Sequence, residues 1–281
     1  MNEQKKAGGA PVFNPEKIAE EKELKKVLGR IKNSLVVLSG KGGVGKSTVA
    51  VNLASALARR GFKTGLLDVD VHGPSVPGML GLEGEKPVAN QAGKLIPIEH
   101  NSSLKVISVG FLMDDRDDAI VWRGPLKHGV IKQFLKDVEW GDLDYLIVDS
   151  PPGTGDEPLS VIQLLENPGG AVIVTTPQDV ALSDVRKSVT FCRKLELPIA
   201  GVIENMSGFS CPHCGEQIDI FKKGGGEEMS RQMDVPFLGG IPIEPGIVTG
   251  GDAGKPFSME KEAATGAARA FDDIVEKLIK K

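Results

Sequence analysis

The segment 40–48 constrains the fold of this chain more than any other part of its sequence. It reads Gly-Lys-Gly-Gly-Val-Gly-Lys-Ser-Thr and satisfies the phosphate-binding pattern G-x-x-x-x-G-K-[ST]. Its glycines let the backbone fold tightly around an anion, with successive N–H groups aimed inward. Lys46 is expected to serve the β- and γ-phosphates of a nucleotide, and Ser47 to give an oxygen to Mg²⁺. The predicted nucleotide site is therefore the whole loop: Gly40, Lys41, Gly42, Gly43, Val44, Gly45, Lys46, Ser47 and Thr48.

The residues on either side of this loop predict a strand before it and a helix after it. Residues 35–38 are an apolar run typical of a buried strand. Beyond the loop, Val49, Leu53 and Leu57 recur every four residues, which indicates a helix that ends near Gly61. The phosphates would then lie at a helix N-terminus, where the dipole and free N–H groups favour negative charge. A glycine-rich turn without a ligand is the alternative, and it leaves this context unexplained.

The composition indicates a globular protein with an aliphatic core. Of 281 residues, 40% are hydrophobic but only 5% are aromatic, which suits a buried parallel sheet rich in Val, Ile, Leu and Ala. The net charge of −4 gives no basic footprint for nucleic acid. No apolar run reaches about 18 residues, the length that indicates a membrane span. Because the polar N-terminus also lacks the apolar region of a secretory signal, we expect a cytoplasmic protein without nucleic-acid or membrane partners.

Strand-like runs alternate with helical patterns along most of the chain. This alternation predicts an α/β fold, with a mostly parallel sheet covered by helices on both faces. Residues 1–15 are expected to form a flexible tail, and residues 16–281 a single domain. Residues 81–102 and 208–230 are long irregular insertions, and long insertions tend to carry function.

Carboxylates close two of the predicted strands. Asp68 and Asp70 end the run 64–70, and because they are two residues apart they point to the same face. Asp149 ends the apolar run 146–149 and precedes a loop rich in proline and glycine. In such folds ligands gather at the C-terminal ends of the strands, so these acids are expected to bind Mg²⁺ through water or to orient an attacking water. The alternative is that they only cap loops.

The pair Cys211-Pro-His-Cys214 is the second informative feature. C-x-x-C spacing brings two thiolates to one metal or cluster edge. A structural zinc site needs four ligands, and this chain has no second such pair. Cys192 is a poor substitute, because it falls on one helical stripe with Val185 and Val189 and is expected to lie in the core. The sequence after Cys214 gives no sign of the helix that a thioredoxin-like redox pair usually opens.

Three motifs resemble one known family over roughly residues 32–280. Lys-Gly-Gly-Val-Gly-Lys-Ser at 41–47 resembles the deviant Walker A signature, which has a second lysine at Lys41. Residues 140–156, Trp-Gly-Asp-Leu-Asp-Tyr-Leu-Ile-Val-Asp-Ser-Pro-Pro-Gly-Thr-Gly-Asp, and residues 121–125, which include Arg123, resemble the Mrp family. Mrp-type proteins are ATPases that assemble and deliver iron–sulfur clusters.

This resemblance implies roles for individual residues. Lys41 would reach across a homodimer interface to the partner's nucleotide, and together with Lys46, Asp70 and Asp149 it would form the catalytic set for ATP hydrolysis. Asp70 matches the switch I aspartate, residues 150–156 match switch II, and Asn205 matches an asparagine that reads the adenine edge. Cys211 and Cys214 of two subunits would hold a bridging [4Fe–4S] cluster, which is passed to apo iron–sulfur proteins. Zinc in the same four-cysteine cage is the main competing occupant.

Two other functions fit parts of the sequence. A MinD/ParA-like positioning switch with a structural zinc site would want a membrane-seeking C-terminal helix, whereas residues 271–281 mix acids with bases and resemble a helix docked on the core. An electron-transfer protein like the nitrogenase iron protein would bridge its cluster with cysteines far apart in sequence. Neither matches the paired cysteines as well as a cluster carrier does.

Overall fold

The fold is organised around one large sheet. The computed structural model describes residues 15–113, 124–211, 213–257 and 265–280. The strands within them are β1 (Ile31–Ser39), β2 (Thr64–Asp68), β3 (Ile98–Asn101), β4 (Leu104–Ser108), β5 (Leu143–Asp149), β6 (Gly170–Thr175), β7 (Ile199–Ser210), β8 (Gln217–Ile218) and β9 (Phe237–Ile243). Their order is β3-β4-β2-β5-β1-β6-β7-β8, and β9 also pairs with β7. Only the β3–β4 and β7–β8 pairs are antiparallel among these strands, which confirms the predicted mostly parallel sheet.

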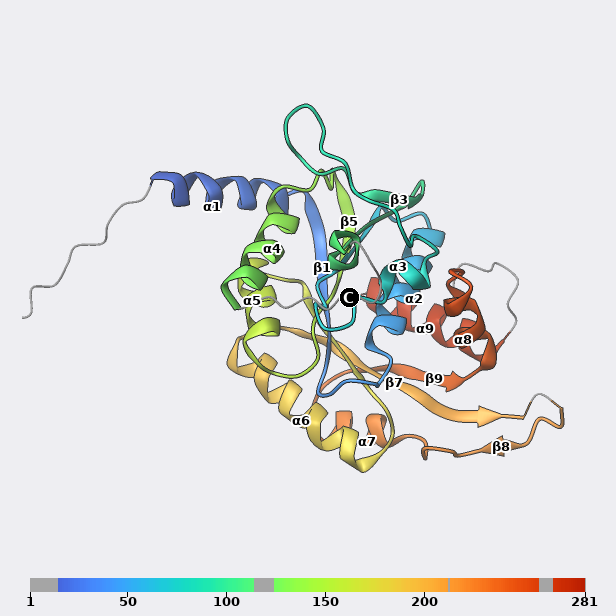
Figure 1. Cartoon of the computed structure of the whole chain (residues 1–281). Helices are drawn as coiled ribbons and strands as arrows, with labels where there is room; N and C mark the ends of the chain where they lie inside the picture. Colours follow the sequence, from blue (N-terminus) through green and yellow to red (C-terminus); the bar gives the residue numbers. More distant parts are fainter. Residues whose placement is uncertain (1–14, 114–123, 212, 258–264, 281) are drawn as a thin grey trace, which may run out of the picture.

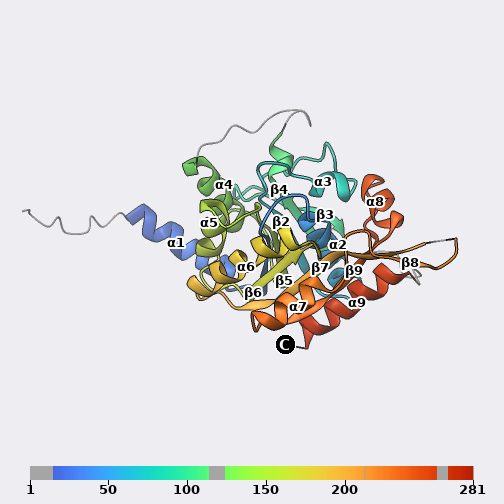
Figure 2. The ribbon, with the colours of Figure 1, turned by 90° about the horizontal axis from the view of Figure 1, so that it is seen from below.

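Helices cover both faces of this sheet (Figure 1, Figure 2). The helices of the described residues are α1 (Pro15–Leu28), α2 (Lys46–Arg59), α3 (Val76–Met79), the 3₁₀ helix η1 (Val109–Leu112), α4 (Gly124–Lys136), α5 (Asp156–Leu164), α6 (Asp179–Lys194), α7 (Gly225–Gln232), α8 (Pro245–Asp252) and α9 (Gly266–Ile279). None of them is long and apolar enough to cross a bilayer.

Two hydrophobic cores form because strand side chains alternate between the faces. Along β1, Leu35 and Val37 pack with α2 and α9, whereas Val36 and Leu38 pack with α4, α5 and α6. Both sets are fully buried or nearly so, as expected for a parallel sheet covered on both sides. The two layers hold the strands rigidly, and the carboxyl ends of β1, β2 and β5 meet at one edge of the sheet.

Strand β7 is 12 residues long. The apolar run 199–203 is only its first part, and the strand continues to Ser210. Its register against β9 shifts between Asn205 and Phe209, where Met206 has φ 57° and Gly208 has φ 77°. Beyond this bulge Phe209 still pairs with Ile243 of β9, and the strand also pairs with β8, so the insertion predicted as irregular begins as a hairpin.

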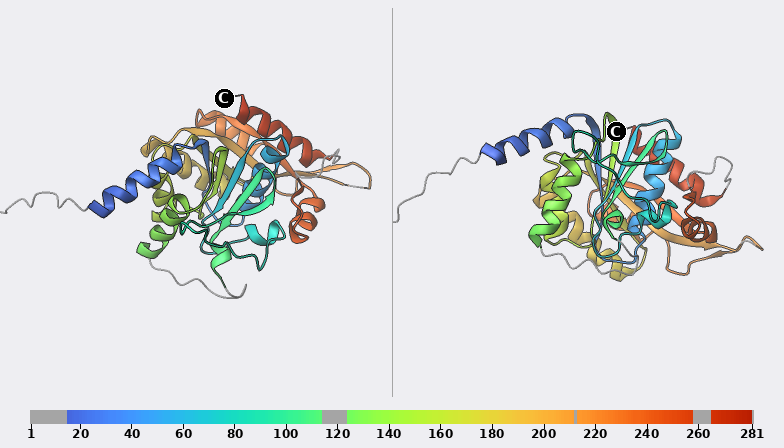
Figure 3. Two further views of the ribbon diagram at one scale, coloured as in Figure 1. Left: turned by 90° about the horizontal axis from the view of Figure 1, so that it is seen from above. Right: turned by 45° about the horizontal axis from the view of Figure 1, so that its top comes forward.

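The β7–β8 hairpin projects from the molecule on the side opposite α1 (Figure 1, Figure 3). Helix α1 is in contact with α4, and its polar sequence leaves Leu24 as its buried residue. Helix α2 packs on α9, where Asp272 pairs with Arg59 and Arg60. The phosphate-binding loop and the cysteine pair are therefore carried by one continuous sheet, the first at its carboxyl edge and the second on an extension.

Two matched valines test the importance of the double core. Val172 in β6 is 0% exposed, whereas Val180 in α6 is 70% exposed. Because Val172→Ala removes buried methyl groups and leaves a cavity, it should lower the free energy of unfolding by about 2 kcal/mol. Val180→Ala should change it by less than about 0.5 kcal/mol. Urea denaturation of both variants measures the difference, and equal effects would contradict this packing.

Candidate functional site

The phosphate-binding loop connects β1 to α2, as predicted. Two of its glycines are enforced by their surroundings. A Cβ on Gly40 would lie 2.5 Å from the backbone carbonyl carbon of Asp184 in α6. Gly45 has φ 82°, and a Cβ there would lie 2.2 Å from Nδ2 of Asn205. Seven of the predicted loop residues line a cavity of about 210 Å³ together with Asp70: Lys41, Gly42, Gly43, Gly45, Lys46, Ser47 and Thr48.

Lys46 joins the loop to both predicted carboxylates. Its Nζ lies 2.6 Å from Asp149 Oδ1 and 3.2 Å from Asp70 Oδ2, and its side chain is only 6% exposed. Burial raises the pKa of Asp149, while the charge of Lys46 opposes this change. The second oxygen of Asp149, Oδ2, is buried and has no hydrogen-bond partner among the described residues. Two buried carboxylates beside a single ammonium, with one oxygen unpaired, are a donor set suited to a hard divalent cation.

Asp68 and Asp70 are different in the structure, although the residue pattern left them equivalent and only the family resemblance singled out Asp70. Asp70 lines the small cavity, whereas Asp68 is fully buried beneath it. Asp68 accepts hydrogen bonds from Ser108 Oγ at 2.7 Å and from the backbone N–H of Asp70 at 3.1 Å. Burial and the nearby charge of Asp149 raise the pKa of Asp68 to about 8. Asp68 therefore supports the turn that carries Asp70 and does not face the cavity.

Asn205 lies inside β7 and contacts the phosphate-binding loop directly. Its Nδ2 donates a hydrogen bond to the backbone oxygen of Val44 at 2.9 Å. Asn205 is buried, and it comes directly before the bulge at Met206. The amide still carries a second N–H and a carbonyl oxygen that are suited to a nucleotide base.

The two cysteines of the C-x-x-C pair lie at the end of the projecting hairpin. Cys211 donates its N–H to Glu216 and accepts at its carbonyl oxygen from Gly215, which closes a tight turn. The N–H groups of Cys214 and His213, and then the Cys214 side chain, lower the pKa of the Cys211 thiol. This turn favours the thiolate, the form that binds metal. No group of three or more metal-ligating side chains occurs within the parts of the chain that the structure describes.

Cys192 lies in the core, as its helical stripe predicts. It is fully buried in α6, and burial raises the pKa of its thiol to about 12. All three cysteines are free thiols.

Sequence reasoning missed a polar cluster beside the site. His72, two residues after Asp70, lies 3.1 Å from both carboxylate oxygens of Glu157 in α5, and Lys127 of α4 contacts both side chains. This cluster connects the loop after β2 to α5, the helix that follows the loop after β5. No local signal could reveal it, because its members are 55 and 85 residues apart. Arg123, the other residue considered for this region, lies outside the described residues.

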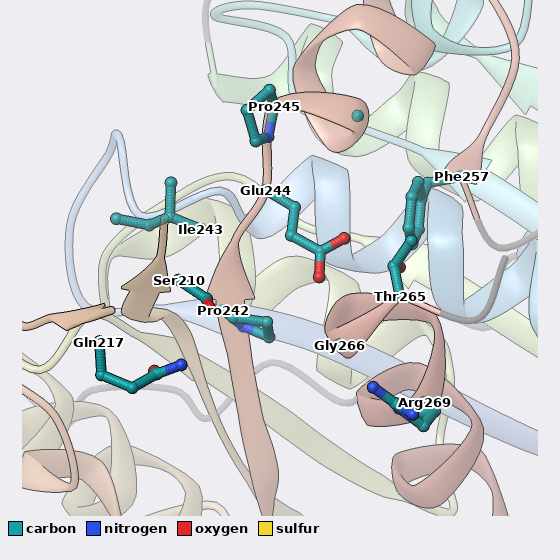
Figure 4. A pocket seen from close by; sticks show the side chains of 11 residues that line it. Ser210, Gln217, Pro242, Ile243, Glu244, Pro245, Phe257, Thr265, Gly266 and Arg269 are labelled. Atoms are coloured by element: carbon teal, nitrogen blue, oxygen red, sulfur yellow. The ribbon is translucent and has the colours of Figure 1, made fainter. Parts of the chain in front are cut away.

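A larger cavity of about 570 Å³ lies at the root of the hairpin (Figure 4). Its walls include Pro242, Ile243 and Glu244, at the end of β9. The carboxylate of Glu244 points into the space, and its Oε1 accepts the N–H of Ala267 at the start of α9. Neither Asn205 nor a residue of the phosphate-binding loop lines this cavity, so it is separate from the phosphate site.

The buried Asp68 should make stability depend on pH. The folded protein keeps the Asp68 proton up to about pH 8, whereas the unfolded chain loses it near the ordinary value of 3.8. Between these values the unfolded state binds fewer protons, so this group lowers the free energy of unfolding as pH rises. Asp68→Asn removes the titration, and its stability relative to the wild type should increase from about pH 5 to about pH 8. Urea denaturation at both pH values measures this; a constant difference would contradict the assignment.

Comparisons with known proteins identify the family of this chain. A family model described as ParA: NUBPL iron-transfer P-loop NTPase matches residues 30–279. The iron-sulfur cluster carrier protein of Methanocaldococcus jannaschii is 46% identical, over 93% of this chain and 89% of its own length. The cytosolic Fe-S cluster assembly factor NUBP2 homolog of Trichoplax adhaerens is 51% identical, over 92% and 98% respectively.

Solved structures show the same architecture. The nucleotide-binding protein of Archaeoglobus fulgidus in complex with ADP, with cobalt found, has a TM-score of 0.76 and 39% identity over 86% of this chain and 94% of its own. The cell division ATPase MinD of Pyrococcus furiosus has a TM-score of 0.65 and 26% identity over 89% of this chain and 99% of its own. Together with the loop, its two carboxylates and the cysteine turn, these matches confirm the resemblance: the chain belongs to the NUBPL iron-transfer P-loop NTPases of the ParA group.

Proposed function

We propose that this protein is an ATP-hydrolysing carrier that binds a [4Fe–4S] cluster between two identical subunits and passes it to apo iron–sulfur proteins. The cysteine turn is the observation that carries the proposal. It presents two cysteines on a projecting hairpin, one of which, Cys211, has a lowered thiol pKa, without a third ligand among the described residues. Such a pair is half of a four-cysteine cluster site. The relatives named carrier and assembly factors support the cargo, and those named cytosolic support a cytoplasmic location.

The carboxyl edge of the sheet is suited to ATP and Mg²⁺. The loop 40–48 would hold the phosphates, with Lys46 as the buried charge and Asn205 beside the base. Ser47, with Asp70 and Asp149 directly or through water, would hold Mg²⁺. The unpaired Oδ2 of Asp149 supports this fit. When bound, Mg²⁺ neutralises phosphate charge, and the carboxylate of Asp70 lies where it can orient a water.

Lys41 is proposed to act on the nucleotide of the partner subunit. It lines the small cavity, and its backbone oxygen accepts a hydrogen bond from Ser39 Oγ at 2.9 Å. The backbone is therefore held while the long side chain can reach outward. A cation supplied to a phosphoryl-transfer site stabilises the charge that develops there.

A MinD/ParA-like switch with structural zinc is the second candidate. One observation favours it: Cys211 accepts hydrogen bonds from backbone N–H groups, an arrangement that suits zinc as well as iron. Anaerobic reconstitution with iron and sulfide, followed by absorption spectroscopy and metal analysis, separates the two candidates. Tight zinc without cluster uptake would support the switch.

Loss of either hairpin cysteine should abolish cluster binding. Cys211→Ser or Cys214→Ser removes two of the four proposed ligands in the dimer, so iron and sulfide content after reconstitution should fall to background. Cys192→Ala is the matched control and should keep one cluster per dimer, because this thiol is buried in α6. Dimerisation, measured by sedimentation, should weaken when metal is removed. A full cluster in each monomer would overturn the shared site.

Mixed dimers test the role of Lys41. Lys41→Ala should slow ATP hydrolysis, by up to about 10³–10⁵-fold if the effect resembles that of a cation supplied to other phosphoryl-transfer sites. Mixing it with an inactive Lys46→Ala subunit should restore activity, because each mixed dimer has one intact site that receives Lys41 from the partner. Lys22→Ala, at an exposed lysine of α1, is the control and should behave as wild type. Normal hydrolysis by Lys41→Ala alone would refute the role.

A further inference from the structure

The peptide unit between Val44 and Gly45 links Asn205 to the phosphate cavity. The carbonyl of Val44 accepts the hydrogen bond from Asn205, and the N–H at the other end of the same unit belongs to Gly45, which lines the phosphate cavity. No described peptide bond is cis, so this N–H and carbonyl point in opposite directions from one plane. An anion that accepts from the Gly45 N–H therefore orients and polarises the carbonyl that holds Asn205.

Two residues that flank Asn205 in β7, Glu204 and Ser207, are joined by their side chains. Ser207 Oγ donates to Glu204 Oε1 at 2.5 Å, which closes a loop around Asn205 and Met206. Glu204 is fully buried, and it also accepts the N–H of Gly224 at 2.8 Å and that of Gly226. Its carboxylate is thus bonded to Ser207, before the hairpin, and to Gly224 and Gly226, after it.

The bulge at Met206 lies between two of the residues that make these bonds, Asn205 and Ser207. Met206 occupies a left-handed conformation that a non-glycine residue adopts only where its surroundings impose it. The bonds of Asn205 before it and Ser207 after it provide this constraint. The segment from Ser207 to Cys211 is paired with β9 and β8 at Phe209, and its root is held by bonds that include one to the phosphate-binding loop.

We propose that Glu204 and Ser207 are positioning residues that couple the phosphate-binding loop to the cysteine hairpin, so that nucleotide tightens metal binding at Cys211 and Cys214. Phosphate at the Gly45 N–H strengthens the Val44–Asn205 bond, and this bond together with the Ser207–Glu204 clamp holds the hairpin root in one orientation. Loss of phosphate loosens the root and favours release of the metal. The proposal deepens the proposed function and rests on its assignment of the two sites.

Co²⁺ binding provides a test that does not require cluster assembly. Its affinity for Cys211 and Cys214 is followed by thiolate-to-cobalt absorption in the full chain, with and without saturating ADP, at buffered free Co²⁺ with Mg²⁺ in excess in both arms. ADP should raise the affinity by about 5-fold or more, the usual lower range of coupling between sites. Because coupling is reciprocal, saturating Co²⁺ should lower the dissociation constant of ADP by the same factor.

Ser207→Ala is the informative variant, because alanine fits the same space and removes only the hydroxyl clamp. In this variant the factor by which ADP raises the Co²⁺ affinity should fall toward one. The affinity for ADP without metal should stay at the wild-type value. Ser188→Ala is the matched control: this serine is also buried, but its hydroxyl bonds within α6, so the wild-type factor should remain.

Two results would overturn the coupling. ADP could leave the Co²⁺ affinity of the wild type unchanged, or ADP could raise the Co²⁺ affinity of Ser207→Ala as much as that of the wild type. Failure of the proposed function has a different signature. In that case Co²⁺ binding would respond to ADP and depend on Ser207, but anaerobic reconstitution would assemble no iron–sulfur cluster.

Discussion

The ammonium of Lys46 between Asp149 and Asp70 is the interaction on which this structure depends. Its Nζ contacts both carboxylates in a buried space, and it connects the loop after β1 with the loops after β2 and β5. Leaving either carboxylate there without a counter-charge would cost far more than an exposed ion pair contributes. The same charges that hold the three loops together are thus those proposed to handle phosphate and Mg²⁺. The charge of Lys46 therefore has a structural as well as a chemical role.

The sequence was sufficient for the centre of the site because its signals are local. The loop pattern around Lys46 is contiguous, and Asp149 directly follows an apolar run, so strand, loop and helix could be placed without knowledge of the sheet order. The mostly parallel sheet followed from the alternation of strand and helix patterns. The burial of Cys192 followed from its position on a helical stripe.

Features that depend on distant partners could not be predicted. Asp68 and Asp70 differ because Ser108, on a neighbouring strand, holds only the first. The continuation of β7 depends on pairing with β8 and β9 and on a bulge at Met206, a residue without turn propensity. Glu204 shows no sequence sign of burial, since its partners at Gly224 and Gly226 lie beyond the hairpin. In each case tertiary contacts decide the local structure.

In the proposed carrier, the hairpin supplies only two of the four cysteine ligands of the cluster. The same turn on a second copy of this chain, or on a related chain, could complete four-cysteine coordination in the same way. The metal alone therefore cannot select the partner. In such a carrier the choice between identical and mixed pairs would come from surfaces away from the cysteines, and these surfaces can change in evolution while the coordination chemistry stays the same.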